Sequence, residues 1–444
     1  MQQDLTQGKI GSGLVRFALP LMAGNLLQQF YNVADTWIVG RFLGAEALAA
    51  VGSAYTLMVF LTSILLGLSM GSGAVFSIYY GRREEGALRC SLVISFLLIG
   101  GAALLLTAGA FAGADGILQL LQAPKEVAPL MGGYLRVVYA GIIASFLYNY
   151  FASLLRALGN SVVPLVFLGV SAVLNVVLDL VFVLVVPWGV EGAALATVIA
   201  QYVSGLGIGV YTLARFSGLR PQRRDVRWDA QIAKEIGSLS VLTCVQQSIM
   251  NFGILMVQGR VNSFGPQVMA AFAAGVKIDS FAYMPVQDFG NAFSTFTAQN
   301  YGAGKRERIE QGIRTALLWV AVFCAVISVG VYLFAPRLMG IFVAAEETEI
   351  IRIGARYLRI EGACYLGIGL LFLLYGLYRA VKRPGMSVVL TVLSLGTRVL
   401  LAYTLSALPA VGVTGIWVSV PIGWFLADAV GIAYFLRRRE KLLE

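Results

Sequence analysis

The sequence predicts an all-α integral membrane protein whose twelve transmembrane helices form two six-helix bundles related by a pseudo-two-fold axis. Three observations carry this prediction. The composition is 58% hydrophobic and only 13% charged, twelve apolar runs are long enough to cross a bilayer, and the second half of the chain repeats motifs of the first.

The composition excludes an ordinary soluble domain, in which about 25% of residues are charged. A spanning helix needs roughly 20 apolar residues, so 444 residues hold twelve spans and leave no room for a large catalytic domain. We therefore expect a protein that is not an enzyme. The four cysteines are scattered singly through apolar stretches and there is no histidine, so neither a metal site nor a cofactor is expected.

Apolar runs bounded by charged or Gly/Pro-rich segments mark the predicted spans. The first six cover residues 14–39, 48–79, 92–112, 134–155, 162–186 and 193–215. The second six cover residues 236–258, 268–300, 316–334, 357–377, 386–408 and 413–435. This pattern predicts an N-terminal lobe at 1–217, a basic linker at 218–235 and a C-terminal lobe at 236–444.

The basic residues decide the predicted orientation. Most of the 33 Lys and Arg residues lie in the terminal segments and in alternate loops. We expect a multi-pass protein of the plasma membrane, which is the inner membrane of the cell. By the positive-inside rule, the linker and both termini are predicted to face the cytoplasm. The net charge of +10 belongs to these loops, so no nucleic-acid partner is expected.

An internal repeat relates the two halves. Short motifs of the first half recur in the second half at offsets of 221 and then 223 residues. The matched motifs are Tyr80-Gly81 with Tyr301-Gly302, Tyr134-Leu135-Arg136 with Tyr357-Leu358-Arg359, Arg156-Ala157 with Arg379-Ala380, and Gly189-Val190 with Gly412-Val413. Because each half has an even number of spans, both halves enter the membrane in the same direction, and the substrate path is expected where they meet.

Two acidic residues lie within predicted spans of the first half. Asp35 and Asp179 both fall in the outer half of their spans, so they are expected to share one chamber. An unpaired carboxylate at bilayer depth is costly, which favours a bundle interior or a wet cavity. Because burial and a neighbouring acid both favour the protonated form, we hypothesise that either acid binds and releases a proton. Asn175 and Thr197 complete the predicted ion-coupling site.

Other polar and aromatic side chains within spans are candidate residues of a substrate cavity. The candidates are Asn25, Gln28, Tyr31, Asn32, Tyr139, Asn149, Gln201, Gln247, Asn251, Lys277, Asp288 and Arg398. Aromatic rings and adaptable side chains suit bulky lipophilic cations. The alternative is structural, because amides bond membrane helices together and Lys277 and Arg398 can form neutralised ion pairs with nearby acids.

The predicted energy source follows from the lack of a nucleotide-binding phosphate loop in the sequence. Gly302-Ala303-Gly304-Lys305 lacks the upstream glycine and the following Ser or Thr of a nucleotide-binding phosphate loop. A gradient of H⁺ or Na⁺ is therefore the expected driving force.

Five segments resemble the multidrug and toxic compound extrusion (MATE) family of the multidrug/oligosaccharidyl-lipid/polysaccharide superfamily. They are YNVADTWIVG at 31–40, GSGAVFSIYYGRREEGALR at 71–89, RALGNSVVP at 156–164, GVEGAALATVIAQ at 189–201 and TAQNYGAGK at 297–305. The resemblance implies a MATE-like, monomeric, twelve-helix exporter in the lipid bilayer. It would antiport H⁺ or Na⁺ against small organic, often cationic and lipophilic, compounds by alternating access, and the family's coupling acids match Asp35 and Asp179, with Asn175 beside the latter.

One departure from the family favours coupling in the first lobe. Branches with coupling acids in the second lobe use carboxylates in the seventh and tenth helices. Here the seventh span has Gln246 and Gln247, and the tenth has only Glu361 near its outer end. This pattern favours H⁺, although Asp, Asn and Thr oxygens also suit Na⁺ as a hard cation.

Two other classes of function stay open at this point. A flippase for a lipid-linked precursor should line its cavity with many bases for a diphosphate, and Lys277 and Arg398 are few. In a channel, the polar helix faces would form a continuous pore lining. A scaffold that transports nothing would have no pathway through the membrane.

Overall fold

The computed structural model describes residues 3–120 and 127–443, and within these residues every regular element is a helix. The first half contains α1 (Ile10–Phe42), α2 (Ala45–Arg82), α3 (Glu85–Ala112), α4 (Ala114–Leu120), α5 (Ala128–Tyr139), α6 (Gly141–Ala157), α7 (Val162–Leu180), the π-helical turn η1 (Val181–Val185) and α8 (Gly189–Arg215). After the short turns η2 (Ser217–Leu219) and η3 (Arg223–Asp225) come α9 (Ala230–Asn262), α10 (Pro266–Gly302), α11 (Arg306–Met339), α12 (Thr348–Gly362), α13 (Tyr365–Ala380), α14 (Pro384–Leu405) and α15 (Thr414–Leu443). The all-α prediction is confirmed.

The helices account for the predicted membrane spans. Among the described residues, nine helices are long and apolar enough to cross a membrane, and two bent pairs raise the number to eleven. The remaining long helix is α10, with 37 residues. It carries Lys277, Asp279 and Asp288 close together, which lowers the hydropathy of its centre. With α10 included, each predicted span corresponds to a helix or a bent pair.

The two bent pairs occupy equivalent places in the repeat. α5 and α6 meet at 43°, and α12 and α13 meet at 51°. The breaks fall at Ala140 and at Ala363, which the offset of 223 residues relates to each other. Glycine adjoins each break, at Gly141 and Gly362, and glycine weakens a helix by about 1 kcal/mol relative to alanine. Each break lies inside a predicted span, residues 134–155 and 357–377 respectively.

The chain divides into two compact units. The first unit includes the residues up to Asp4 and Leu19–Cys244, and the second includes Leu5–Ala18 and the residues from Val245 onwards. The first two turns of α1 therefore belong to the second unit, and the first half of α9 belongs to the first unit.

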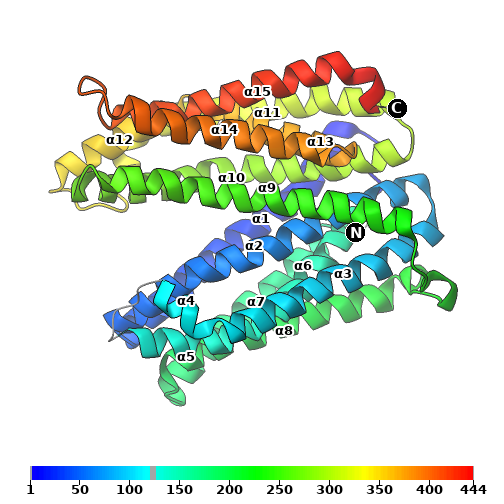
Figure 1. The fold of residues 1–444 in the computed structure, drawn as a ribbon, viewed down its shortest axis with the longest axis horizontal. Helices are drawn as coiled ribbons and strands as arrows, with labels where there is room; N and C mark the ends of the chain where they lie inside the picture. Colours follow the sequence, from blue (N-terminus) through cyan, green and yellow to red (C-terminus); the bar gives the residue numbers. More distant parts are fainter. Residues whose placement is uncertain (1–2, 121–126, 444) are drawn as a thin grey trace. The chain divides into compact units, whose positions relative to one another are not determined.

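Close backbone contacts characterise the packing of the first unit. α6 packs against α2 and α8, and α7 runs beside α8 (Figure 1). A Cβ on Gly205 of α8 would meet the carbonyl oxygen of Ala144 in α6 at 2.7 Å. Gly71 of α2 faces the backbone of α9 at Leu239 and Ser240 in the same way. Small residues let membrane helices approach this closely.

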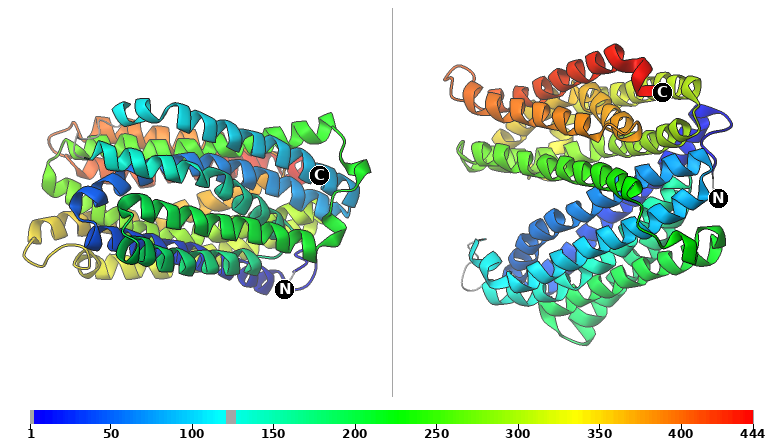
Figure 2. Two further views of the ribbon diagram at one scale, coloured as in Figure 1. Left: turned by 90° about the horizontal axis from the view of Figure 1, so that it is seen from below. Right: turned by 45° about the vertical axis from the view of Figure 1, so that its right-hand side comes forward.

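In the second unit, α14 packs along α15, α10 along α13 and α11 along α12. The orange and red helices α14 and α15 lie side by side in Figures 1 and 2. Phe272 of α10 stacks on Trp417 of α15 with ring centroids 5.4 Å apart, and Tyr357 of α12 meets the same indole edge-on at 5.0 Å. These rings join three helices of the unit.

The linker between the two halves is fastened to the first unit by a buried ion pair. Arg89 of α3 donates from Nε to Asp225 Oδ2 at 2.8 Å and from Nη1 to the carbonyl oxygen of Gly218 at 3.0 Å. The two charged side chains are only 7% and 6% exposed. Asp225 also accepts a hydrogen bond from the backbone N–H of Gln222.

Candidate functional site

The structure places Asp35 and Asp179 close to each other. Asp35 comes from α1 and Asp179 from the last turn of α7, and each carboxyl group acts electrostatically on the other. Asp179 has no exposed surface, whereas Asp35 is half-buried. Because an ionised carboxylate only accepts hydrogen bonds, the two groups can bond to each other only when one of them carries a proton.

Asn175 and Thr197 complete the polar shell of Asp179. The amide of Asn175 lies 3.2 Å from Thr197 Oγ1. When the amide is oriented with its nitrogen towards Asp179, the nitrogen donates to Asp179 Oδ2 at 3.1 Å and the oxygen accepts from the backbone N–H and Oγ1 of Thr197, both at 3.2 Å. Asn175 lies one helical turn before Asp179 on α7, and both are buried. The π-helical turn η1 begins two residues after Asp179, and such turns often occur at functional sites.

Three tyrosines surround the pair of acids. Tyr31 of α1, Tyr55 of α2 and Tyr134 of α5 all interact electrostatically with one or both carboxyl groups or with one another. Asn32 of α1 donates from Nδ2 to the hydroxyl of Tyr55 at 3.3 Å. With Thr197 of α8, five helices therefore contribute side chains to this polar chamber around the two acids. The sequence analysis did not predict Tyr55 and Tyr134 as members.

The electrostatics of this chamber are acidic. Among the described residues, no Lys or Arg forms an ion pair with Asp35 or Asp179, and no group of three His, Cys, Asp or Glu side chains is arranged to hold a metal ion. Two carboxyl groups without a basic partner cannot both stay ionised at low cost. The site is therefore suited to bind a proton or a small cation.

The other predicted cavity residues of the first half lie apart from the acid pair or have local partners. Tyr139 is fully buried at the break between α5 and α6, with its ring edge-on to Phe111. Asn149 donates to the carbonyl oxygen of Ser145 in its own helix at 2.8 Å. Gln201 packs against the backbone of Gly141. Asn25 is half-buried on α1 and Gln28 is exposed there.

The second unit contains a polar cluster built around Asp279 and Glu361. The two carboxyl groups, from α10 and α12, act electrostatically on each other. The hydroxyl of Tyr357 lies within donating distance of both, 3.0 Å from Asp279 Oδ2 and 3.1 Å from Glu361 Oε2. The hydroxyl of Tyr365 donates to Asp279 Oδ1. Arg398 of α14 interacts electrostatically with Glu361.

This cluster lines a cavity of about 90 Å³, whose apolar wall includes Met250 and Trp424. α12 begins at Thr348, nine residues before the predicted span, because the polar segment 348–356 gives no hydropathy signal for the start of the helix. The side chain of Glu361 is only 1% exposed, and its predicted place near the outer end of the span stays a prediction.

The remaining candidates of the second half are dispersed. Lys277 is exposed, with its ammonium group 5.9 Å from the ring centroid of Phe342. Asp288 is buried on α10, and Gln247 and Asn251 are half-buried on α9. Their roles as cavity residues stay predictions.

One signal in the sequence points to the residues that the analysis missed. The repeat offset of 223 residues relates Tyr134, beside the first acid pair, to Tyr357, which bonds the second pair. The same offset relates Asn175 to Arg398. The two units thus hold acid pairs with equivalent tyrosine neighbours. Within residues 3–120 and 127–443, a basic residue acts electrostatically on the second pair, and the position equivalent to it in the first unit is Asn175.

Comparisons with known proteins agree with this architecture. A family model described as MatE matches residues 20–181 and 240–404, one match in each half. The chain is 28% identical over 443 residues to the "Probable multidrug resistance protein YpnP" of Bacillus subtilis (strain 168), covering 99% of this chain and 98% of the relative. It is also 28% identical over 445 residues to the "Probable multidrug resistance protein YoeA" of the same organism, covering 98% and 95%.

A solved structure supports the same assignment at the level of the fold. The outward-facing conformation of a multidrug resistance MATE family transporter of the MOP superfamily superimposes with a TM-score of 0.92 at 23% identity, covering 99% of this chain and 98% of that chain. The sequence matches span both halves and the fold agrees over the whole length. This protein belongs to the MatE family of membrane transporters.

Proposed function

We propose that this protein is a secondary active antiporter that exports small organic, often cationic and lipophilic, compounds across the plasma membrane. Membership of the MatE family supports this proposal, as do the relatives whose names describe multidrug resistance. The observation that carries it is the pair of neighbouring acids, Asp35 and Asp179, in the first unit. A membrane protein retains buried carboxyl groups without a basic partner where they serve an ion or substrate pathway.

H⁺ is the proposed coupling ion. This proposal is supported by the proximity of Asp35 and Asp179, because two neighbouring carboxyl groups favour binding of a proton, and Asp35 is only half-buried. Na⁺ is the second candidate, because the oxygens of Asp179, Asn175 and Thr197 are the ligands that a hard cation prefers.

Ion binding would drive alternating access through the charge of this chamber. Loading a proton reduces the charge of the acid pair, and losing it restores an anionic site among buried helices. A change of this kind shifts a conformational equilibrium when the ion binds one state more tightly than the other. A shift from 1:99 to 99:1 requires a difference of about 5.5 kcal/mol, which several changed charge interactions can supply.

The test is transport in everted membrane vesicles. Uptake of a fluorescent organic cation is measured with a pH gradient and a Na⁺ gradient imposed separately, for the wild type, Asp35→Asn and Asp179→Asn. Asp115→Asn serves as the control, because its side chain is 85% exposed. We expect uptake driven by the pH gradient in the wild type and the control, and loss of that uptake in both site variants at equal expression.

The outcomes separate the alternatives. Uptake that follows only the Na⁺ gradient assigns the coupling ion to Na⁺. Uptake that survives both site variants contradicts the role of the acid pair. If neither gradient moves the cation, antiport is wrong, and translocation of a lipid-linked diphosphate then tests the flippase alternative, which the names of the relatives do not favour.

A further inference from the structure

The N-terminal segment is fastened to the second unit by side chains at the end of α10 and the start of α11. The backbone N–H of Leu5 donates to Gln299 Oε1 at 3.1 Å, and its carbonyl oxygen accepts from Asn300 Nδ2 at 3.1 Å. Lys305 donates from Nζ to the carbonyl oxygen of Thr6 at 2.8 Å. The side chains of Leu5 and Thr6 are 2% and 6% exposed, so this segment is a fixed part of the unit.

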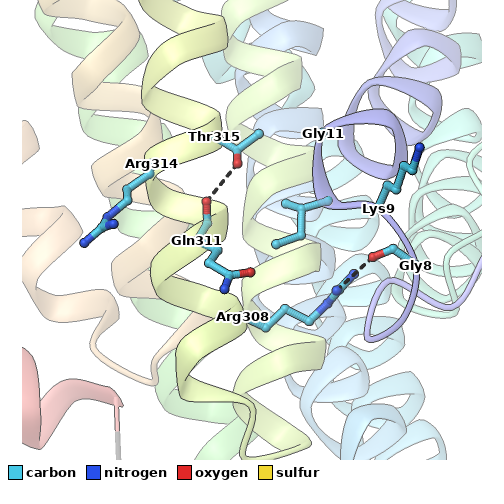
Figure 3. Close-up of a pocket in the computed structure, with 8 residues that line it drawn as sticks. Gly8, Lys9, Gly11, Arg308, Gln311, Arg314 and Thr315 are labelled. Carbon is cyan, nitrogen blue, oxygen red and sulfur yellow. Dashed lines mark hydrogen bonds between the residues drawn. The ribbon is translucent and has the colours of Figure 1, made fainter.

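An open groove of about 540 Å³ lies between this segment and α11. Its walls are Gly8, Lys9, Ile10 and Gly11 on one side and Arg308, Gln311, Arg314 and Thr315 on the other. Arg308 crosses the groove and donates to the carbonyl oxygens of Gln7 at 2.7 Å and Gly8 at 2.9 Å (Figure 3). The volume is in the range of sites that hold whole organic ligands, about 300–1,000 Å³.

The lining of the groove is basic. It contains Lys9, Arg308 and Arg314 and no acidic residue. Lys9 and Arg314 extend from its two edges in Figure 3, and among the described residues neither forms an ion pair. Both are exposed, so their flexible side chains can turn towards a bound anion. Ile10 and Gly11 open α1, where the backbone N–H groups have no intrahelical acceptor and the helix dipole favours an anion.

Apolar surface adjoins the basic groove on the same helix. The next turns of α11 expose Leu318 to 64%, Trp319 to 46% and Val322 to 50%. The indole nitrogen of Trp319 lies 3.5 Å from the position that a Cβ on Gly11 would occupy, which puts the ring beside the groove. Tryptophan is enriched where a membrane helix meets the interface. A pocket that binds a soluble anion needs no neighbouring apolar surface of this kind.

We propose that this groove binds the head group of an anionic phospholipid of the cytoplasmic leaflet, with its acyl chains along the exposed face of α11. The phosphate would lie among Lys9, Arg314 and the first turn of α1, and Arg308 holds the wall that shapes the site. Basic pockets at the cytoplasmic ends of membrane helices bind such head groups. This inference does not depend on the proposed antiport.

The test measures lipid binding directly. Purified protein in an uncharged detergent is titrated with phosphatidylglycerol, phosphatidylcholine or inorganic phosphate, and bound species are counted by native mass spectrometry. The variant Lys9→Gln/Arg314→Gln removes two charges from the groove. The matched control Arg437→Gln/Arg438→Gln removes two exposed charges from the end of α15. Each base near an anionic head group contributes a factor of roughly five, so we expect the groove variant to bind phosphatidylglycerol about 30-fold more weakly.

The outcomes are distinct. Tight binding of phosphatidylglycerol, weak binding of phosphatidylcholine and an effect confined to the groove variant support the proposal. An equal loss in the control variant shows general surface electrostatics and overturns it. Displacement of the lipid by inorganic phosphate at comparable concentration also overturns it, because the site would then recognise a free anion. A groove variant that binds phosphatidylglycerol like the wild type has the same consequence.

Discussion

The buried pair of Arg89 and Asp225 predicts how firmly the linker is held. At the observed Nε–Oδ2 distance of 2.8 Å, the Coulomb attraction is about 6 kcal/mol at an effective dielectric constant of about 20. Much of this offsets desolvation, but removing one partner leaves the other charge buried, which costs about 3–5 kcal/mol. We expect Arg89→Ala or Asp225→Ala to raise the population with a detached linker by a factor of about 140 or more, since 1.4 kcal/mol corresponds to tenfold.

Limited trypsin digestion of inverted membrane vesicles measures this population, because the linker carries several arginines and cleavage tracks the open form when closing is fast. In the double variant Arg89→Ala/Asp225→Ala, linker cleavage by trypsin should rise by less than the two single variants together predict, because no unpaired charge is left buried. Arg83→Ala is the control. It breaks an ion pair with Asp4 in the same unit, but the side chain of Arg83 is 58% exposed, so little buried charge is left unpaired. A rise in linker cleavage of less than tenfold in both single variants would refute the reasoning.

Three further predictions concern the helices and the acid pairs. Gly71→Leu should lower the melting temperature in detergent, because any Cβ would clash with the α9 backbone and overpacking costs about 1–3 kcal/mol; Gly101→Leu, where the Cβ would meet nothing within 4 Å, should not. Arg398→Asn should lower the melting temperature of the second unit, because Arg398 is a cation that acts on the buried carboxyl group of Glu361, and adding Glu361→Gln should recover part of that loss. Tyr134→Phe should reduce transport driven by the proposed gradient at unchanged expression, whereas a rate equal to that of the wild type would show that its hydroxyl does not act on the acid pair.

The sequence was informative about the helices wherever hydropathy alone decides. Long apolar runs require lipid as a solvent, so the spans could be located from composition. The break at Ala140 and the early start of α12 at Thr348 were not predictable in this way. Both depend on how the helix packs within its unit, and segment 348–356 has the charged residues of a surface helix. Element ends of this kind carry little local signal.

The candidate site could be predicted in part. Asp35 and Asp179 stand out because a carboxyl group in an apolar span is costly. Their similar depths along the two spans predict that they lie in one chamber. Tyr55 and Tyr134 gave no such signal, since tyrosine is also common in helix packing and at membrane interfaces. The acid pair formed by Asp279 and Glu361 depends on the packing of α10 against α12, which hydropathy does not encode.

The repeat bears on the proposal that an ion is coupled in the first unit. Each unit holds two carboxyl groups close together, and the offset of 223 residues places Asn175 and Arg398 at equivalent positions on their helices. Among the described residues, the guanidinium of Arg398 interacts electrostatically with Glu361 of the second pair, whereas the residue at the equivalent position in the first unit is the neutral amide of Asn175, which hydrogen-bonds near Asp179. A neutral amide leaves the charge of an ionised acid to be balanced by an exchangeable cation. This difference is the physical reason why we propose that H⁺ or Na⁺ binds at Asp35 and Asp179.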